Sequence, residues 1–237
     1  MAERIRIQKA IARAGLMSRR AAEEAMVEGR VLLNGEPVVL GDRVDPDVDI
    51  LTVDGAPVPV KQDLETHLLY KPVGVISTAD DPQGRPTVVD LVPSERRLYP
   101  VGRLDSDSEG LILVSNDGEL TNRVTHPSYG ITKTYLAEVS GHPDRATIRR
   151  LTDGVELDDG PARAHSARVV DSQQDRALVE LVMVEGRNRE VRRMMDTVGH
   201  QVLRLVRTAI GPITDTNLKP GESRRLTAPE IQNLLSR

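Results

Sequence analysis

Hydrophobic positions near the N-terminus recur at the spacing of an α-helix. Buried helical stripes follow an i, i+3, i+4, i+7 pattern, and here that pattern is made by Ile7, Ala10, Ile11 and Ala14. It predicts a helix over residues 5–15. Ser18 is a typical N-cap residue, so we expect a second helix over residues 19–28. Asn34-Gly35 then lies between two apolar runs, which predicts a tight β-hairpin turn.

A second set of elements is predicted beyond the proline-containing stretch 57–65, which has no amphipathic period. Short apolar runs predict strands at 67–70, at 101, and over 111–114, 133–139 and 177–184. Helices are predicted over 88–92, 144–151 and 189–198, and a capping box at Thr227–Glu230 predicts a short C-terminal helix. Strands and helices do not alternate regularly, so the expected fold class is α+β.

Composition excludes several classes of protein. The chain has no cysteine, which excludes disulfides, thiolate metal sites and cysteine catalysis. Its charged N-terminus lacks the apolar segment of a secretory signal, and no stretch approaches the ~20 apolar residues of a membrane span. We therefore expect a cytoplasmic protein that does not enter a membrane. Trp and Phe are absent, so any ring that stacks on a base has to be one of the four tyrosines or a histidine.

Charge is distributed unevenly, although the net charge is only −4. Residues 1–30 hold seven Lys or Arg against four acids, and residues 31–60 hold one against six. Residues 185–207 hold six Arg against three acids. Two basic regions separated by acidic surface can still bind RNA locally.

The N-terminal pattern combines a basic helical stripe with a second helix that opens on Ser18-Arg19-Arg20 and a hairpin. It resembles the S-four-like RNA-binding domain, named after a ribosomal protein, over residues 4–53. The matching residues are Ile7-Gln8-Lys9-Ala10, Ala14-Gly15, Ser18-Arg19-Arg20-Ala21, Gly29-Arg30-Val31 and Val38. The resemblance implies RNA contacts from Arg6, Lys9, Arg13, Ser18, Arg19 and Arg20. The alternative is that Arg6, Lys9 and Arg13 form only a solvated helix face.

The most informative run extends from Gly102 to Gly118 and contains Arg103-Leu104-Asp105-Ser106-Asp107-Ser108-Glu109-Gly110. An acidic loop between two glycines leads into an apolar strand, and a carboxylate at such a loop mouth is a plausible reactive position. Acidic loops are more often solvated or metal-binding. Asp105, Asp107 and Glu109 alternate like calcium ligands, but the twelve-residue calcium pattern is not met, so no metal site is expected.

This run resembles the signature of the ribosomal RNA pseudouridine synthase family that includes the RsuA and RluB enzymes. Three further segments agree in the same order, from about residue 67 to residue 218: Leu69-Tyr70-Lys71-Pro72-Val73-Gly74-Val75, Lys133-Thr134-Tyr135 and Glu185-Gly186-Arg187-Asn188-Arg189-Glu190-Val191-Arg192-Arg193-Met194. Ser108 stands where Thr is commoner in the family, and Met195 stands where an aromatic residue is expected. Glu190 replaces a Gln of several branches, a variant similar to the large-subunit synthase B branch.

The resemblance implies a fold, an activity and a set of site residues. It implies an S-four-like domain over 1–60, a linker over 61–66 and a catalytic domain over 67–237 with a mixed, mainly antiparallel sheet. The catalytic residues would be Asp105, Tyr135 and Arg192, with Arg192 keeping Asp105 ionised. Arg103 would fill the position that the target base vacates, and Arg187, Arg189 and Arg193 would bind phosphates or brace the site. No cofactor is implied, and the expected partner of a monomeric enzyme is ribosomal RNA or a pre-ribosomal particle.

The sequence leaves two other functions open. One is a non-catalytic ribosome assembly factor that retains the synthase fold. The joint presence of Asp105, Tyr135 and Arg192 argues against it, because a retired enzyme need not keep all three. The other is a different RNA enzyme such as a methyltransferase, for which no Gly-rich nucleotide loop is found. The Glu190 context favours large-subunit RNA, while small-subunit and dual-site enzymes stay possible.

Overall fold

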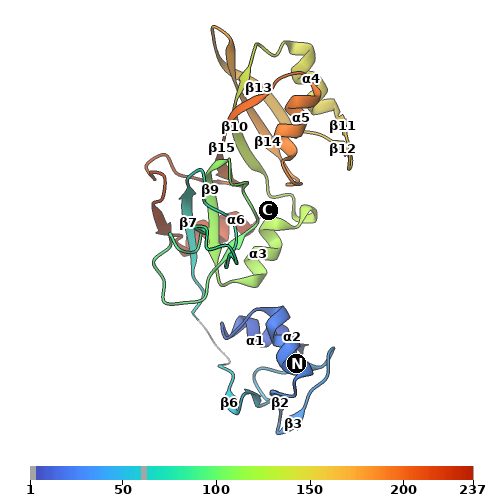
Figure 1. The fold of residues 1–237 in the computed structure, drawn as a ribbon, viewed down its shortest axis with the longest axis vertical. Coiled ribbons are helices and arrows are strands. Elements are labelled where there is room, and N and C mark those ends of the chain that lie inside the picture. Colours follow the sequence, from blue (N-terminus) through green and yellow to red (C-terminus); the bar gives the residue numbers. More distant parts are fainter. Residues whose placement is uncertain (1–3, 60–62, 237) are drawn as a thin grey trace. The chain divides into compact units, whose positions relative to one another are not determined.

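The computed structural model describes residues 4–59 and 63–236 (Figure 1). Contacts divide the chain into two compact units. The first extends up to Glu65 and includes the short segments Ser94–Arg97 and Asn116–Gly118, and the second contains the remaining residues. The expected bounds 1–60 and 67–237 stay predictions. Part of the expected linker, residues 61 and 62, lies outside the described residues.

The first unit combines two helices with short strands. The helices are α1 (Ile7–Arg13) and α2 (Arg19–Val27), and the strands are β1 (Ile5–Arg6), β2 (Val31–Leu33), β3 (Glu36–Pro37), β4 (Arg43–Val44), β5 (Leu51–Val53) and β6 (Ala56–Pro57). Helix α1 begins later than predicted because Ile5 pairs with Val44 as a strand. The predicted N-cap is confirmed, since Ser18 Oγ accepts a hydrogen bond from Ala21 N. Both residues of the predicted Asn34-Gly35 turn have positive φ, as a tight hairpin requires.

The second unit is built on one large sheet. Its strand order is β13 (Ser166–Gln173), β14 (Arg176–Met183), β10 (Lys133–Ser140), β15 (Val202–Ile210), β9 (Glu109–Ser115), β7 (Thr66–Lys71) and β17 (Ser223–Arg225). Two more strands join it, β16 (Ile213–Thr214) beside β15 and β8 (Tyr99–Val101) beside β9. The pairings along this order are antiparallel except for the parallel pair β9 and β15. The predicted α+β class with a mixed, mainly antiparallel sheet is confirmed.

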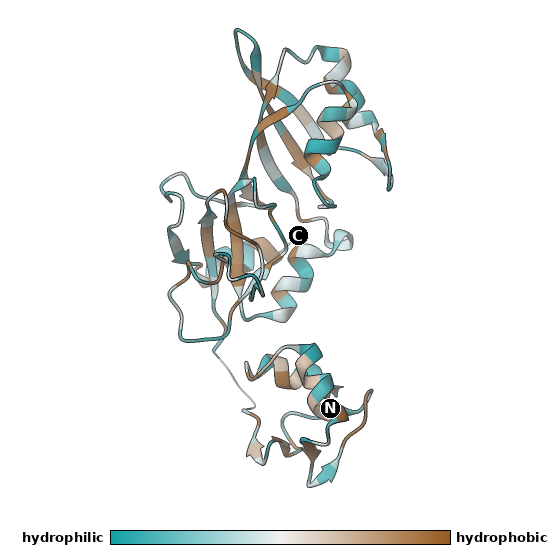
Figure 2. Cartoon of the chain, in the orientation of Figure 1, coloured by the Kyte–Doolittle hydropathy of each residue, from teal (hydrophilic) through white to brown (hydrophobic). Residues whose placement is uncertain are grey.

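Helices cover the two halves of this sheet. Helices α4 (Arg145–Asp153) and α5 (Glu190–Thr197) share a core with β10 and β14, whereas α3 (Gly118–Thr125) and α6 (Ala228–Leu235) share a second core with β7 and β9. A 3₁₀ turn, Pro127–Tyr129, follows α3, and β11 (Val155–Leu157) pairs with β12 (Gly160–Ala162). Figure 2 shows the hydrophobic colour along β9, each residue of which is buried.

Most predicted elements are confirmed. Asp144 caps α4, and the Thr227–Glu230 capping box opens α6. The predicted helix over 88–92 is wrong: this segment forms turns, and Pro93, which follows directly, has no N–H to continue a helix. Strands β13 and β15 and helix α3 were not predicted. None of the helices in the described residues is long and apolar enough to cross a membrane.

Candidate active site

Three neighbouring strands align the residues from which the site is built. Tyr135 on β10 pairs with Arg207 on β15, and Arg207 pairs in turn with Gly110 on β9. Gly110 has φ 107°, and a Cβ there would lie only 2.3 Å from the carbonyl oxygen of Arg207. A glycine is therefore required for β9 to approach β15 this closely. This approach carries the loop before β9, which contains Asp105, toward the β10 strand that carries Tyr135.

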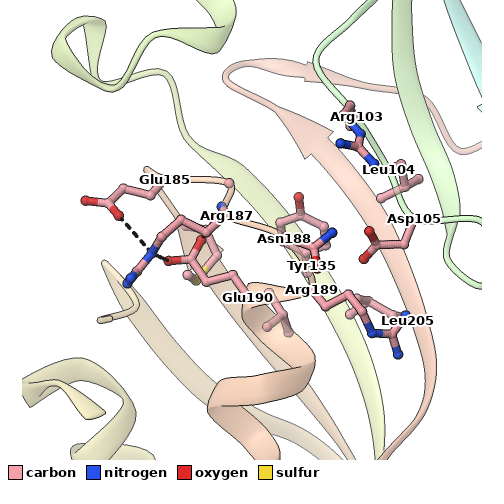
Figure 3. Close-up of a pocket in the computed structure, with 13 residues that line it drawn as sticks. Arg103, Leu104, Asp105, Tyr135, Glu185, Arg187, Asn188, Arg189, Glu190 and Leu205 are labelled. Atoms are coloured by element: carbon pink, nitrogen blue, oxygen red, sulfur yellow. Dashed lines mark hydrogen bonds and ion pairs between the residues drawn. The ribbon is translucent and has the colours of Figure 1, made fainter. Parts of the chain in front are cut away.

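Asp105 and Tyr135 line the same pocket. Asp105 lies half-buried in the loop between β8 and β9, and Tyr135 is only 8% exposed. Figure 3 shows the Asp105 carboxylate pointing toward Tyr135 and Asn188, with Leu205 nearby. Within the described residues, the Asp105 side chain accepts no hydrogen bond from another side chain. Its oxygens are therefore available to a bound molecule.

Buried cations hold the backbone on both sides of Asp105. Lys71 is fully buried, and its Nζ donates to the carbonyl oxygens of Pro72 at 3.0 Å and Ser108 at 2.8 Å. Arg207, 4% exposed, donates to the carbonyl oxygen of Arg103 at 3.2 Å. Burial lowers the pKa of Lys71 to about 8, and the negative charge of Asp105 opposes that shift. These hydrogen bonds fix the backbone on which the Asp105 side chain is carried.

Arg192 contacts the next carboxylate along the loop. Its guanidinium donates to the Asp107 carbonyl oxygen at 2.9 Å and to the Ser108 hydroxyl at 3.4 Å, and its Nε lies 3.5 Å from the Asp107 carboxylate. The direct pairing of Arg192 with Asp105 that the sequence led us to expect is therefore replaced by a pairing with Asp107. The side chain of Arg192 on α5 is buried, and it contacts the loop at Asp107 and Ser108, so it orients the loop as a whole.

Two of the arginines expected to bind RNA are engaged by carboxylates. Arg193 makes a two-pronged contact with the Asp159 carboxylate, at 2.8 and 3.0 Å. Arg187 contacts Asp159 and the buried Glu190, which also accepts a hydrogen bond from the Arg187 backbone N–H. These contacts lower the pKa of Asp159, chiefly through the hydrogen bond from Arg193. Arg187 and Arg193 thus brace the loop beside the pocket, and Glu190 is the carboxylate that anchors it.

Arg103 and Arg189 also line the pocket, as Arg187 does (Figure 3). Arg103 is exposed, and its side chain has no partner in the described part of the chain. Arg189 adopts a left-handed conformation, with φ 48°, directly before α5 and donates to the Asp107 carboxylate at 2.8 Å. Burial acts to raise the pKa of Asp107, but the hydrogen bond from Arg189 and the charge of Arg192 outweigh it, so that pKa lies below its usual range.

In the first unit, the predicted basic residues lie at the surface. Arg6, Lys9, Arg13, Arg19 and Arg20 are exposed. Within residues 4–59 and 63–236, their side chains have no hydrogen-bond or ion-pair partner. Ser18 is partly buried, and its hydroxyl caps α2. The five cationic side chains are available to an anionic partner, whereas the Ser18 hydroxyl already has a structural role.

Sequence reasoning missed residues that support the site. The motif places Lys71 only in a turn, although a lysine ending the apolar run His67-Leu68-Leu69-Tyr70 is a signal of burial. Asn188 lines the pocket but has no role assigned from the sequence. In the described residues, no group of three or more His, Cys, Asp or Glu is arranged to hold a metal ion.

Comparison with known proteins agrees with this geometry. Residues 65–197 match the family model for RNA pseudouridylate synthase, and residues 5–50 match the S4 domain. The chain is 47% identical to an uncharacterized RNA pseudouridine synthase of Mycobacterium leprae, over 97% of this chain and 92% of that protein. It is 42% identical to the ribosomal large subunit pseudouridine synthase B of Bacillus subtilis, over 97% and 95% of the two chains. A crystal structure of a pseudouridylate synthase superposes with a TM-score of 0.69 at 29% identity, over 97% of this chain and 99% of that one.

The chain therefore belongs to the RNA pseudouridine synthase family and carries an S4 domain at its N-terminal end. The expected family resemblance is confirmed, and so is the enzyme class that it implied.

Proposed function

We propose that this chain converts uridine to pseudouridine in ribosomal RNA of the large subunit, with Asp105 as the catalytic carboxylate. The observation that carries this proposal is the position of Asp105. Its carboxylate faces the pocket beside Tyr135 without a hydrogen bond from a side chain of the described residues, while Lys71 and Arg207 hold the adjoining backbone. Similarity to the synthase B of Bacillus subtilis supports the large subunit as the source of the substrate.

The isomerisation needs few groups from the protein. The bond from N1 of uracil to the ribose C1′ breaks, the base turns, and a bond from C5 to C1′ forms. The proton leaves C5, and N1 carries a proton in the product. An ionised carboxylate beside the ribose or the base can act as a nucleophile or as a base. Asp105 occupies a position suited to this role, because it lines the pocket beside Tyr135 on a loop that Lys71 and Arg207 hold in place.

The remaining residues of the pocket receive supporting roles. Tyr135 supplies a flat ring for the target base, which has to leave its stack to be reached. Arg103 is placed to occupy the vacated position in the RNA or to meet a phosphate. Arg192 acts through Asp107 and Ser108 to orient the loop. The Leu205 side chain adds an apolar wall that limits access of water.

The N-terminal unit is proposed as the RNA anchor. Its exposed cations, Arg6, Lys9, Arg13, Arg19 and Arg20, are suited to phosphate contacts, which provide affinity without reading sequence. The proposed domain bounds are 1–60 and 67–237 with a linker over 61–66. The proposed partner of the monomeric enzyme is ribosomal RNA or a pre-ribosomal particle, so we expect it to work in the cytoplasm, where ribosomes are assembled.

The test compares two neighbouring carboxylates. Ribosomal RNA from cells that lack the protein is incubated with the wild type, Asp105→Asn or Asp107→Asn, and pseudouridines are mapped by carbodiimide-based primer extension. We expect the wild type to restore a specific pseudouridine in large-subunit RNA and Asp105→Asn to restore none while still binding RNA. Asp107→Asn should only slow the reaction, because it removes a contact that orients the loop.

If the Asp105→Asn variant converted uridine at the wild-type level, the catalytic assignment would be overturned. If the wild type restored no pseudouridine in any ribosomal RNA but still bound the RNA, a non-catalytic assembly factor would be the better description.

A further inference from the structure

Tyr129 is an exposed aromatic ring in a protein that has very few. The chain contains four tyrosines and no Trp or Phe. Tyr135 is buried, and Tyr70 and Tyr99 are partly covered, whereas Tyr129 is 41% exposed. An isolated exposed apolar residue is ordinary at a protein surface, so the ring needs further evidence before it can be given a role.

That evidence is the construction of the turn that carries Tyr129. Its 3₁₀ turn is capped by His126, whose Nδ1 accepts a hydrogen bond from Ser128 N, and ends at Gly130 in the left-handed conformation with φ 66°. The His126 ring meets Tyr129 edge-on at 6.2 Å between centroids. The Arg123 guanidinium lies 5.8 Å from the centroid of Tyr129 and is fixed by a hydrogen bond to the Leu235 carbonyl oxygen.

The turn is also attached to the catalytic strand. Lys133, two residues before Tyr135 on β10, donates from Nζ to the carbonyl oxygens of Val124 at 2.9 Å and Ile131 at 2.8 Å. These two carbonyls lie on either side of the turn. One half-buried lysine therefore links both ends of the turn to the strand that lines the pocket.

The end of α3, just before the turn, lies close to the Asp105 loop. The Thr125 methyl group lies 3.4 Å from the position that a Cβ of Gly102 would occupy, and Gly102 directly precedes Arg103. Tyr129 follows Thr125 by four positions, a stretch of chain that spans at most ~14 Å. The ring therefore lies within a few nucleotide lengths of the pocket rim.

We propose that Tyr129, together with His126 and Arg123, forms a stacking site for an unpaired RNA base a few nucleotides from the target uridine. This inference rests on the proposed function, because it takes the substrate to be RNA. Unstacked RNA bases bind on Tyr and His rings and on Arg guanidinium planes. A ring that is already held in place loses little conformational freedom on binding. The neighbouring positive charges of Arg123 and Lys133 also suit a polyanion better than an apolar protein partner.

The first measurement is single-turnover conversion of an unmodified large-subunit RNA transcript as RNA concentration is varied. Stacking on an aromatic ring is worth ~1–3 kcal/mol per base, and a half-exposed ring should lie at the low end. We expect Tyr129→Ala to raise the half-saturating RNA concentration about 5- to 10-fold and to leave the saturated rate unchanged. Tyr129→Phe keeps the ring and should behave like the wild type, whereas Tyr129→Leu keeps apolar bulk without a ring and should resemble Tyr129→Ala.

Two further readouts distinguish base stacking from a phosphate contact. The ratio of affinities between wild type and Tyr129→Ala should not change with salt, because no phosphate contact is lost. A short single-stranded RNA that carries 2-aminopurine between uridines should show an emission change on binding the wild type and Tyr129→Phe that is smaller with Tyr129→Ala. The emission assay requires binding only, so it reads the stacking site even if no uridine is converted.

The outcomes are distinct for the two proposals. RNA binding and 2-aminopurine emission without conversion would refute the proposed function and leave the stacking site standing. Conversion by the wild type with unchanged half-saturation and emission in Tyr129→Ala would overturn the stacking site, and so would a ratio of affinities that changes with salt, because it would indicate a phosphate contact. A change of oligomeric state in Tyr129→Ala, in place of a change in RNA affinity, would show that the ring belongs to an interface between copies of the chain and would equally overturn it.

Discussion

Lys71 provides a test of how the site positions Asp105. Burial lowers the pKa of Lys71 from 10.5 to about 8, and the charge of Asp105 opposes this shift. At ~1.4 kcal/mol per pH unit, transfer of Lys71 from water to the core disfavours the ammonium relative to the neutral amine by about 3 kcal/mol. The ammonium of Lys71 donates to the carbonyl oxygens of Pro72 and Ser108, and hydrogen bonds from a charged donor are stronger than those from a neutral amine. Loss of the Lys71 proton should therefore loosen the loop that positions the catalytic carboxylate.

The expected result is an alkaline limb in the pH profile. The saturated rate should be full well below pH 8, fall to half at about pH 8 and decline further above it, since the rate follows the protonated fraction of Lys71. With a pKa near 8, about one tenth of the rate should remain at pH 9. Lys71→Met cannot carry the charge, so its rate should be low at each pH and show no such limb. Single-turnover conversion at saturating RNA, from about pH 6.5 to 9, measures this.

Lys133 is the matched control. Burial, assisted by the charge of Arg207, also lowers the pKa of Lys133 to about 8, but Lys133 binds the carbonyls of Val124 and Ile131 and not the Asp105 loop. Lys133→Met should therefore keep the alkaline limb. A limb that survives Lys71→Met, or disappears in Lys133→Met, would refute the reasoning. If Lys71→Met does not fold, a wild-type rate that stays level through pH 9 refutes it equally well.

Two further predictions concern the frame of the site and the RNA anchor. Gly110→Ala should lower the thermal midpoint more than Gly160→Ala does, because the two glycines have similar φ of 107° and 103° but only the Cβ at Gly110 would meet the backbone of Arg207, at 2.3 Å. The free energy of unfolding of the two variants should differ by ~1–3 kcal/mol or more in calorimetry. Equal thermal midpoints would contradict the close approach of β9 to β15. The double variant Lys9→Ala, Arg13→Ala should bind RNA more weakly and with a shallower salt dependence, with a saturated rate near that of the wild type. Filter binding at two salt concentrations measures this, and an unchanged slope would show that both side chains are only solvated.

Local signals in the sequence were sufficient for several elements. The Ser18 cap, the Asn34-Gly35 turn and the Thr227–Glu230 capping box depend on contacts within a few residues, and all three are present. The helix predicted over 88–92 failed for an equally local reason, since Pro93 directly after it has no N–H and disfavours helical geometry at Val92. Strand β13 was missed because most of its residues are exposed, so it lacks the alternation that marks a half-buried strand.

The sequence by itself determined the family and the enzyme class, because these depend on motifs that are contiguous along the chain, and two of those motifs carry Asp105 and Tyr135. Only the tertiary structure decided which charges meet. Arg192 pairs with the Asp107 carboxylate, and Arg207 donates to the carbonyl oxygen of Arg103, 104 residues earlier in the chain. Such contacts follow from the register of β9, β15 and β10, which depends on how closely Gly110 approaches Arg207. A register between strands distant in sequence is set by packing over the whole sheet, so no local pattern records it.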